Sequence, residues 1–292
     1  MKTNKRAKWM LGLSMIIFGT LGPFTRNIAV TSGELALYRA LLATVLIVVF
    51  ILLTGQKIEL KAIKKELLLL LFSGMAMGIN WILLFEAYKY TTISTATLSY
   101  YFAPVLVTIV CPFFFRERLT KYQVLCFVMS TIGLALIIGF EGNAGGNNHL
   151  LGILLGLGAA FFYACVILMN KYIKNVVGIQ RTFFQFVAAI VILVPYVLCT
   201  GGMHPEVLDT KGWICLLIVG LVHTGITYCM YFTSLKEMKG QEVAILSYLD
   251  PLVAVLVSVV ILGEKMNFMQ IIGGIFILGF TFLNEYAENV DK

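Results

Sequence analysis

Ten apolar stretches, each roughly twenty residues long, dominate the chain and are separated by short polar segments. By hydropathy they span residues 8–26, 34–54, 67–88, 91–113, 120–140, 150–170, 179–200, 212–234, 242–262 and 267–285. Each stretch can cross the ~30 Å hydrocarbon core of a bilayer as a helix. The stretches lack the alternating period of a membrane β-barrel, and a backbone in lipid must satisfy its own hydrogen bonds. The pattern therefore predicts an all-α integral membrane protein with ten transmembrane helices.

The composition leaves no room for a soluble catalytic domain. Hydrophobic residues make up 60% of the 292 residues and charged residues 13%, and the mean hydropathy is +0.92. Soluble domains contain roughly 45–50% apolar and about 25% charged residues. The formal net charge of +7 comes from small groups of Lys and Arg between apolar stretches, not from one basic face. This distribution is typical of membrane orientation signals, so we expect no binding of nucleic acid.

The basic residues also predict the orientation of the helices. With the N-terminus in the cytoplasm, 17 of the 22 Lys and Arg residues lie on the cytoplasmic side, 4 lie on the opposite side, and Arg39 lies within a helix. Cytoplasmic loops carry an excess of Lys and Arg in multi-pass proteins. The sequence therefore predicts a multi-pass protein of the plasma or inner membrane with both termini in the cytoplasm.

The second half of the chain repeats the first half at a shift of 147 residues. Scarce residue types coincide at this shift: Tyr101 with Tyr248, Pro104 with Pro251, Glu117 with Glu264, and Gln123 with Gln270. We predict a first five-helix repeat at 1–140, a linker at 141–148 and a second repeat at 149–292. Because five is an odd number of crossings, the second repeat enters the membrane from the other side. Inverted repeats of this kind place a substrate site at their interface and permit alternating access, which favours a transporter.

Two paired segments resemble the motifs of the EamA family. They are Tyr101–Pro104 with Arg116–Leu119, and Tyr248–Pro251 with Gly263–Met266. Each half of an EamA protein has a proline in its fourth helix and a Gly-Glu-like element before its fifth helix. Arg39 resembles the arginine that is common in the second helix of this family.

The resemblance covers essentially the whole chain, and it implies a member of the drug/metabolite transporter (DMT) superfamily. Such proteins have ten helices in tandem halves, a central cavity and secondary transport activity that is often export. Arg116 departs from the glycine that is usual at its position, whereas Gly263 retains the glycine in the second half. The family transports amino acids, nucleosides, cofactors and toxic cations, so membership does not identify a substrate.

Asp250 is an acidic residue deep in the ninth predicted helix. Ionisable groups at such a depth are costly and normally face the bundle interior or a wet cavity. Asp250 precedes Pro251, which removes a backbone donor and, with Pro104 of the first half, is a candidate helix hinge. Ser247, Asp250, Ala254 and Ser258 share one helical face, a polar stripe that should look inward. We expect Asp250 to contact substrate or carry a proton, and the alternative is a packing acid bonded to a neighbour.

Arg39 is the second ionisable residue that lies within a predicted span. Its planar guanidinium suits a bidentate contact with a substrate carboxylate. Together with Asp250 it would suit a zwitterion, which is the only indication of amino acids that the residues themselves give. Two alternatives remain open: Arg39 extends to the outer headgroups or holds helix ends, or it pairs with Asp250.

Further polar and aromatic candidates fall at repeat-related positions of the third, fourth, eighth and ninth helices. They are Asn80, Trp81, Tyr100, Tyr101, Tyr228, Tyr231 and Tyr248. Such residues can line an amphipathic cavity or attract cations, although Trp and Tyr also gather at membrane interfaces. His223 and Thr227 share a helical face, and His223 is a candidate proton relay or a hydrogen-bonded interior histidine.

Two glutamates and two glycines are given structural roles. Glu117 and Glu264 each precede the last helix of their half, where a carboxylate near the helix N-terminus is favourable, and they are candidates for gating. Gly74 and Gly78 form a small-xxx-small face for close helix contact.

The sequence predicts a transporter that uses no cofactor and has no catalytic residues or metal site. It lacks a phosphate-binding loop, a zinc-protease motif, a nucleophile elbow and a dinucleotide fingerprint. We expect a secondary or facilitative transporter that exports amino acids or related amphipathic compounds. Its expected partners are a small-molecule substrate, the lipid bilayer and protons as the coupling ion, while the oligomeric state, monomer or homodimer, is open. The alternatives are efflux of organic cations or drugs and, from another class, an intramembrane lipid-modifying enzyme.

Overall fold

The computed structural model describes residues 5–55, 60–103, 105–107, 110, 121–139, 148–176, 178–235, 246–247 and 249–290. All regular secondary structure in these residues is helical. The first half contains α1 (Lys5–Gly19), α2 (Leu21–Thr25), α3 (Ser32–Thr54), α4 (Leu60–Tyr90), α5 (Ile93–Tyr100) and α7 (Lys121–Gly139). The second half contains α8 (His149–Tyr172), α9 (Gly178–Cys199), η1 (Pro205–Val207), α10 (Thr210–Leu217), η2 (Ile218–Ile226), α11 (Thr227–Leu235), α13 (Leu249–Val260) and α14 (Phe268–Val290).

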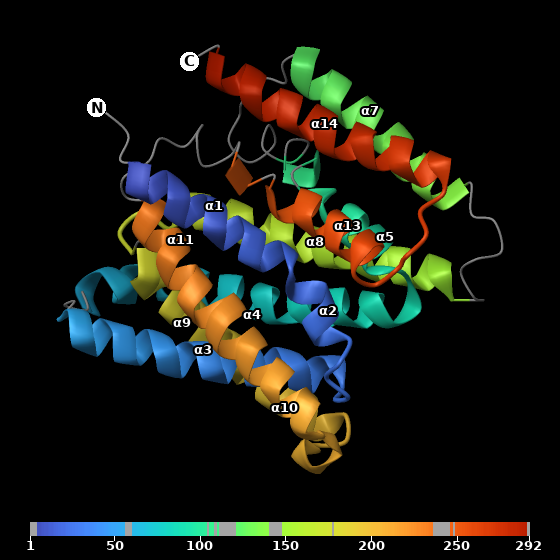
Figure 1. Ribbon diagram of the computed structural model, residues 1–292. Coiled ribbons are helices and arrows are strands. Elements are labelled where there is room, and N and C mark those ends of the chain that lie inside the picture. The colour runs from blue at the N-terminus through green and yellow to red at the C-terminus, as the bar shows by residue number, and fades with distance from the viewer. Residues whose placement is uncertain are drawn as a thin grey trace.

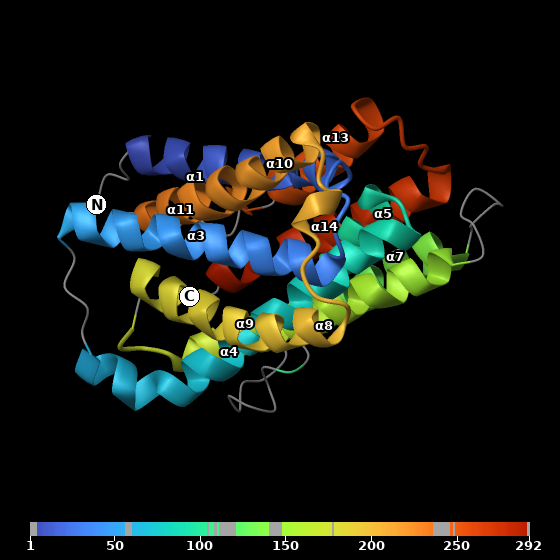
Figure 2. The same ribbon diagram turned by 90° about the horizontal axis from the view of Figure 1, so that it is seen from below.

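The helices form a bundle in which α1 begins and α14 ends at the same end (Figures 1 and 2). Six helical segments in the described residues are long and apolar enough to cross a membrane. Four shorter apolar helices occupy the other four predicted spans: Ile93–Val107, Val124–Ile137, Leu249–Val260 and Phe268–Phe280. Each of the ten predicted spans therefore contains an apolar helix within the described residues.

Two of the spans are less regular than hydropathy suggests. The first span is interrupted at Thr20, between α1 and α2. The eighth span runs from α10 through η2 into α11, and η2 is a π-helical segment of 9 residues. The side-chain hydroxyls of Thr224 in η2 and of Thr227, the first residue of α11, donate hydrogen bonds to carbonyls five residues earlier, those of Val219 and Val222. Such π-helical turns are rare in proteins and are frequent at functional sites.

Helix packing follows the two-fold relation that inverted repeats produce. Three contacts join equivalent helices of the two halves: α3 with α9, α5 with α13, and α7 with α14. The remaining main contacts between the halves come in equivalent pairs. The contact of α1 with α11 corresponds to that of α8 with α4, α1 with α13 to α8 with α5, and α3 with η2 to α9 with α4.

The same relation holds for individual residues. A Cβ atom on Gly78 would lie 3.1 Å from Ile192 of α9, and one on Gly225 would lie 3.1 Å from Leu46 of α3. Gly78 and Gly225 are equivalent in the repeat, and so are Leu46 and Ile192 at a shift of 146. The chain thus uses the same close contact twice, once in each half.

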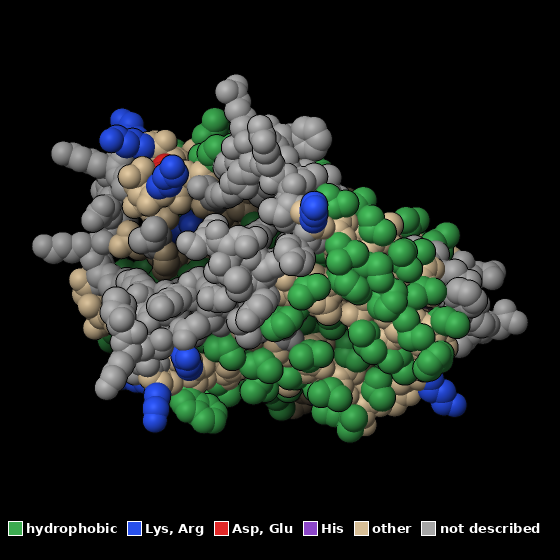
Figure 3. Space-filling model, turned by 90° about the horizontal axis from the view of Figure 1, so that it is seen from above, with side chains coloured by type: hydrophobic (Ala, Val, Ile, Leu, Met, Phe, Trp, Pro, Cys, Tyr) green, Lys and Arg blue, Asp and Glu red, His purple; other side chains and the backbone are tan. Residues whose placement is uncertain are grey.

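The outer surface of the bundle is apolar, as lipid contact requires. Figure 3 shows hydrophobic side chains on the part of the outer surface that includes α7 and α14. Exposed residues there include Leu125, Phe127 and Ile132 of α7 and Phe268 and Ile275 of α14. The interior core lies between α3, α4, α9 and η2, where Phe186 and Leu193 are fully buried.

Candidate functional site

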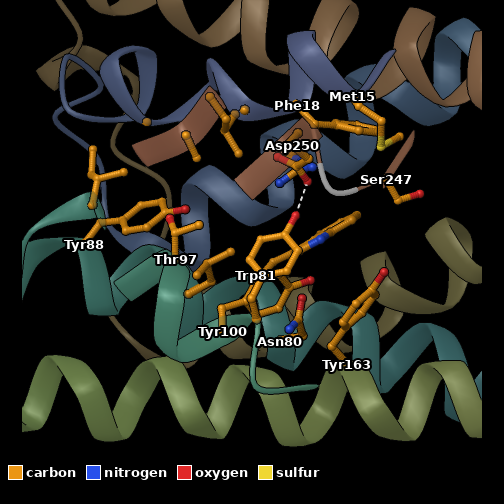
Figure 4. A pocket seen from close by; sticks show the side chains of 18 of the residues that line it. Met15, Phe18, Asn80, Trp81, Tyr88, Thr97, Tyr100, Tyr163, Ser247 and Asp250 are labelled. Atoms are coloured by element: carbon orange, nitrogen blue, oxygen red, sulfur yellow. Dashed lines mark hydrogen bonds between the residues drawn. The ribbon is translucent and has the colours of Figure 1, made fainter. Parts of the chain in front are cut away.

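A central cavity of about 210 Å³ lies between the two halves, bordered by α1, α2, α3, α4, α5, α8, α11 and α13 (Figure 4). It contains eight of the predicted substrate contacts: Arg39, Asn80, Trp81, Tyr100, Tyr101, Tyr228, Ser247 and Asp250. Tyr231 lines it as well. Side chains that were far apart in the sequence therefore meet around one space.

Arg39 is 4% exposed and is held from two sides. Its Nε donates a hydrogen bond of 2.6 Å to Thr224 Oγ1 of η2. Its guanidinium carbon lies 4.7 Å from the centre of the Trp81 ring and 5.6 Å from that of Phe85. A desolvated cation on an aromatic face gains about 2 kcal/mol or more, which offsets part of the cost of burying the charge. Among the described residues no acceptor bonds the two terminal nitrogens of this guanidinium.

Asp250 projects into the cavity from the first turn of α13 (Figure 4). Its Oδ2 accepts a hydrogen bond from the Tyr101 hydroxyl. This bond links the end of α5 in the first half to α13 in the second half. The described residues contain no ion pair between Asp250 and Arg39, so the pairing left open by the sequence does not occur in this conformation. The two charges are separate contact points in one cavity.

The predicted polar face of α13 has two different environments along its length. Ser247, Asp250 and Ala254 line the cavity. Ser258 instead lies 2.5 Å from Ser94 of α5, hydroxyl to hydroxyl, and is fully buried outside the cavity lining. This face therefore serves the cavity at one end and helix packing at the other.

Aromatic rings form much of the cavity wall. Tyr100 contacts Tyr101 and Tyr163 with ring centres 5.5 Å and 5.2 Å apart. Tyr163 and Tyr88 also line the cavity and were not predicted from the sequence. The side-chain amide of Asn80 donates a hydrogen bond of 2.6 Å to the Ala159 carbonyl, so it also links α4 to α8.

His223 and Thr227 lie outside the cavity lining. His223 Nε2 lies 3.0 Å from Thr20 Oγ1, and its ring centre is 4.9 Å from that of Phe24. The Thr227 hydroxyl donates a hydrogen bond of 2.7 Å to the Val222 carbonyl of η2, which continues directly into α11. The role next to the cavity belongs instead to Thr224, which orients Arg39 and was not predicted.

Three other candidates, Tyr248, Pro104 and Glu117, lie outside the described residues. Pro251 is buried in the first turn of α13. Its role as a hinge, and that of Pro104, stays a prediction.

Glu264 is placed differently from the prediction, which put it at the N-terminus of the last helix. Its carboxylate accepts hydrogen bonds from the Ile93 and Ser94 backbone N–H groups at 2.9 Å and 3.1 Å, and from Ser94 Oγ at 2.8 Å. It also bonds Arg26 after α2. The last helix, α14, is capped by Asn267, whose side-chain oxygen accepts a hydrogen bond of 2.7 Å from the Gln270 N–H. Glu264 therefore neutralises the N-terminus of α5 in the other half of the chain.

These Glu264 contacts lie at the border of the cavity. Ile93, one of the lining residues, is 2% exposed, and a Cβ atom on Gly22 would lie 2.8 Å from its side chain. Gly19 packs as tightly, since its Cβ would lie 2.6 Å from the Asp250 carbonyl oxygen. The residues are thus tightly packed where α2, α5 and the segment before α14 meet at the border of the cavity. We call the contacts of Glu264 with Arg26, Ile93 and Ser94 the Glu264 lock.

Comparisons with known proteins point to one class. The model of the EamA-like transporter family matches residues 6–139 and again 150–285. The chain is similar to the uncharacterized transporter YxxF of Bacillus subtilis (strain 168), at 33% identity over 93% of this chain and 87% of that protein. It is also similar to a protein of Salmonella typhimurium (strain LT2) named "Probable amino-acid metabolite efflux pump", at 28% identity over 62% of this chain and 63% of that one.

The fold itself recurs in a solved crystal structure. That structure covers 99% of this chain with a TM-score of 0.64 and 16% sequence identity, and this chain covers all of it. The matched family and the named relatives are transporters rather than enzymes.

Proposed function

The chain belongs to the EamA-like transporter family, and we propose that it exports amino acids or related small amphipathic metabolites by alternating access. Transport is the function of the family. The substrate, the direction and the mechanism are our proposal. The observation that carries it is one small cavity that holds Arg39 and Asp250 as separate charges.

The chemistry of these two charges suits a zwitterion. The terminal nitrogens of Arg39 have no acceptor in the described part of the chain, so a carboxylate is a natural ligand for this planar fork. Asp250 offers its second oxygen to an ammonium group, since Tyr101 bonds only Oδ2. A ligand that carries both groups pairs both buried charges at once, which offsets part of the desolvation cost of each.

The size of the cavity supports a small substrate. Pockets for drug-sized ligands have volumes of about 300–1,000 Å³. A cavity of about 210 Å³ falls below that range and suits a single small metabolite. Efflux of organic cations is the second candidate, because Asp250 and the aromatic wall also suit a cation. The small volume and Arg39 favour the zwitterion over this candidate.

The relative from Salmonella typhimurium supports the proposed export of amino acids, since its printed name refers to amino-acid metabolites and efflux. The excess of Lys and Arg on one side supports cytoplasmic termini in the plasma or inner membrane. Two inverted repeats, 1–140 and 149–292 with the linker 141–148, supply the two equivalent conformations that alternating access requires. Protons remain the proposed coupling ion.

The proposed function is tested with purified protein in liposomes. We expect uptake of labelled amino acids without chemical change, and faster uptake when a pH gradient is imposed. A panel of amino acids, organic cations and nucleosides, each with and without the gradient, identifies the substrate class. Transport of cations alone would replace the proposal by the second candidate, and uptake of no panel member would contradict it.

The Glu264 lock predicts a gating variant. Replacing Glu264 by glutamine keeps the size of the side chain but removes the ion pair with Arg26 and weakens the bonds to α5. A hydrogen bond to a charged group contributes about 1.5–3 kcal/mol, so we expect the closed state to lose roughly 10- to 100-fold in population. Thr97 lines the cavity behind the lock, and a Thr97→Cys reporter measures this opening by its labelling rate with an impermeant thiol reagent.

The matched control is Glu206→Gln. Glu206, in η1 before α10, is exposed and lies 3.0 Å from His204 (Oε1 to Nδ1), away from the cavity lining. This control should leave labelling of Thr97→Cys unchanged. Equal labelling rates in the Glu264→Gln variant and its parent would show that the lock does not gate the cavity.

A further inference from the structure

Thr97 of α5 carries a buried hydroxyl in the wall of the central cavity. The side chain is 4% exposed, and its Oγ1 has no hydrogen-bond partner in the described part of the chain. Threonines in helices often turn this hydroxyl back to the carbonyl four residues earlier. Five other threonines of the chain make that bond: Thr44, Thr54, Thr131, Thr200 and Thr233. Thr97 leaves it unmade, so its hydroxyl is available to a ligand.

A second hydroxyl, that of Tyr88 near the end of α4, lies beside Thr97. Tyr88 also lines the cavity, and Figure 4 shows the two side chains next to each other. The two side chains interact. Each hydroxyl has one proton and two lone pairs, so even a hydrogen bond between them would leave one proton and three lone pairs unused. The pair can therefore both donate to and accept from one group of a ligand.

The cavity wall next to these hydroxyls is apolar. Leu84 and Ile93 line the cavity one helical turn before Tyr88 and Thr97, on the same faces of α4 and α5. Arg39 and Asp250 are the charged side chains among the described lining residues. The region around Tyr88 and Thr97 therefore offers hydrogen bonds within an uncharged environment.

We propose that Tyr88 and Thr97 bind a hydroxyl group on the side chain of the substrate and thereby select hydroxy amino acids. This inference rests on the proposed function, in which Arg39 and Asp250 hold the carboxylate and the ammonium group. A hydroxyl donates and accepts, as the pair does. An apolar side chain would leave the buried hydroxyl of Thr97 unpaired, and a third charge on the substrate would meet no counter-charge among the described lining residues.

Threonine and valine are the matched ligands for a test, because they differ by a hydroxyl in place of a methyl group of similar size. A site built to bond a substrate hydroxyl rejects an analogue without it far more strongly than an apolar pocket rejects a change of one methyl group. We expect kcat/KM for uptake into liposomes to be at least about tenfold higher for threonine than for valine.

Thr97→Val and Tyr88→Phe each remove one hydroxyl at nearly constant size. In both variants we expect the ratio of threonine to valine uptake to fall toward one, while valine uptake is retained. Retained valine uptake distinguishes a lost contact from a damaged protein. The control variant Thr44→Val removes a hydroxyl that donates to the Ala40 carbonyl of its own helix and lies outside the cavity lining, so it should keep the parental ratio.

A second pair of ligands tests the hydroxyl contact without the carboxylate. Isopropanolamine and isobutylamine are threonine and valine without their carboxyl groups, and each is compared by its effect on the thermal midpoint of the purified chain in detergent. A larger shift with isopropanolamine in a chain that transports no amino acid would contradict the proposed function and still support the hydroxyl contact. Equal responses of the parent chain within both pairs, or a parental preference kept by both Thr97→Val and Tyr88→Phe, would overturn the inference.

Discussion

Replacing Arg39 by glutamine is expected to reduce transport of amino acids about 10- to 100-fold while leaving carboxylate-free amines nearly unaffected. The guanidinium is buried, is oriented by Thr224 and is stacked on Trp81, so it is already placed for a ligand carboxylate. A hydrogen bond to a charged partner contributes about 1.5–3 kcal/mol, and about 1.4 kcal/mol corresponds to a factor of ten. Initial uptake rates in liposomes, for an amino acid and for its decarboxylated amine, measure the effect.

The comparison of two ligands distinguishes a lost contact from a damaged protein, because a misfolded variant transports neither compound. Asp250→Asn is the complementary variant, and it should impair amines and amino acids while sparing acids that lack the amino group. Arg39→Lys retains a charge but not the planar fork, so it should recover only part of the loss. If both single variants transport amino acids at the parental rate, the zwitterion proposal is wrong.

Hydropathy predicted the fold because lipid imposes a simple rule. Every span must be apolar and helical, so the ten windows follow from composition along the chain. The pairing of equivalent helices follows from the repeat, and Gly78 with Gly225 illustrates it at the level of single contacts. Local irregularities were not predictable in this way. The break at Thr20 and the π-helical segment η2 contain ordinary apolar residues that hydropathy cannot separate from regular helix.

The candidate site was predictable in its charges and only partly in its walls. Arg39 and Asp250 stood out because ionised groups are rare within apolar spans. His223 and Thr227 were placed on one face by regular helical spacing, whereas the wider turns of η2 bring Thr224 to Arg39 instead. The face that Tyr163 presents depends on the packing of α8 against α4 and α5, which no local pattern encodes.

Glu264 shows a second limit of local reasoning. A carboxylate just before a helix is sensibly assigned to that helix, but Asn267 already caps α14. Glu264 is then available for the free N–H groups of α5, more than 160 residues away in sequence. Such a contact between the halves becomes visible only when the halves are assembled.

The second large effect is expected at Gly74, where α4 crosses α9. A Cβ atom at this position would lie 2.2 Å from the Gln185 carbonyl oxygen and 2.6 Å from the Ala188 Cβ. Neither atom can rotate away, because one is backbone and the other is the first side-chain atom. Even alanine at Gly74 must therefore push the two helices apart, which also disturbs the bonds of Gln185 to Ser73 and Asn170.

We expect Gly74→Ala to cost at least the upper part of the roughly 1–3 kcal/mol range for overpacking, and Gly74→Leu to yield little folded protein. At about 2–4 °C per kcal/mol, the thermal midpoint of the alanine variant in detergent should fall by roughly 5 °C or more. Gly279→Ala is the matched control: its Cβ would meet no atom of the described residues within 4 Å, and alanine favours helix over glycine by about 0.5–1 kcal/mol. The control should therefore match or exceed the parent. A Gly74→Ala variant as stable as this control would mean that α4 and α9 are not in the close contact on which the cavity wall at Asn80 and Trp81 depends.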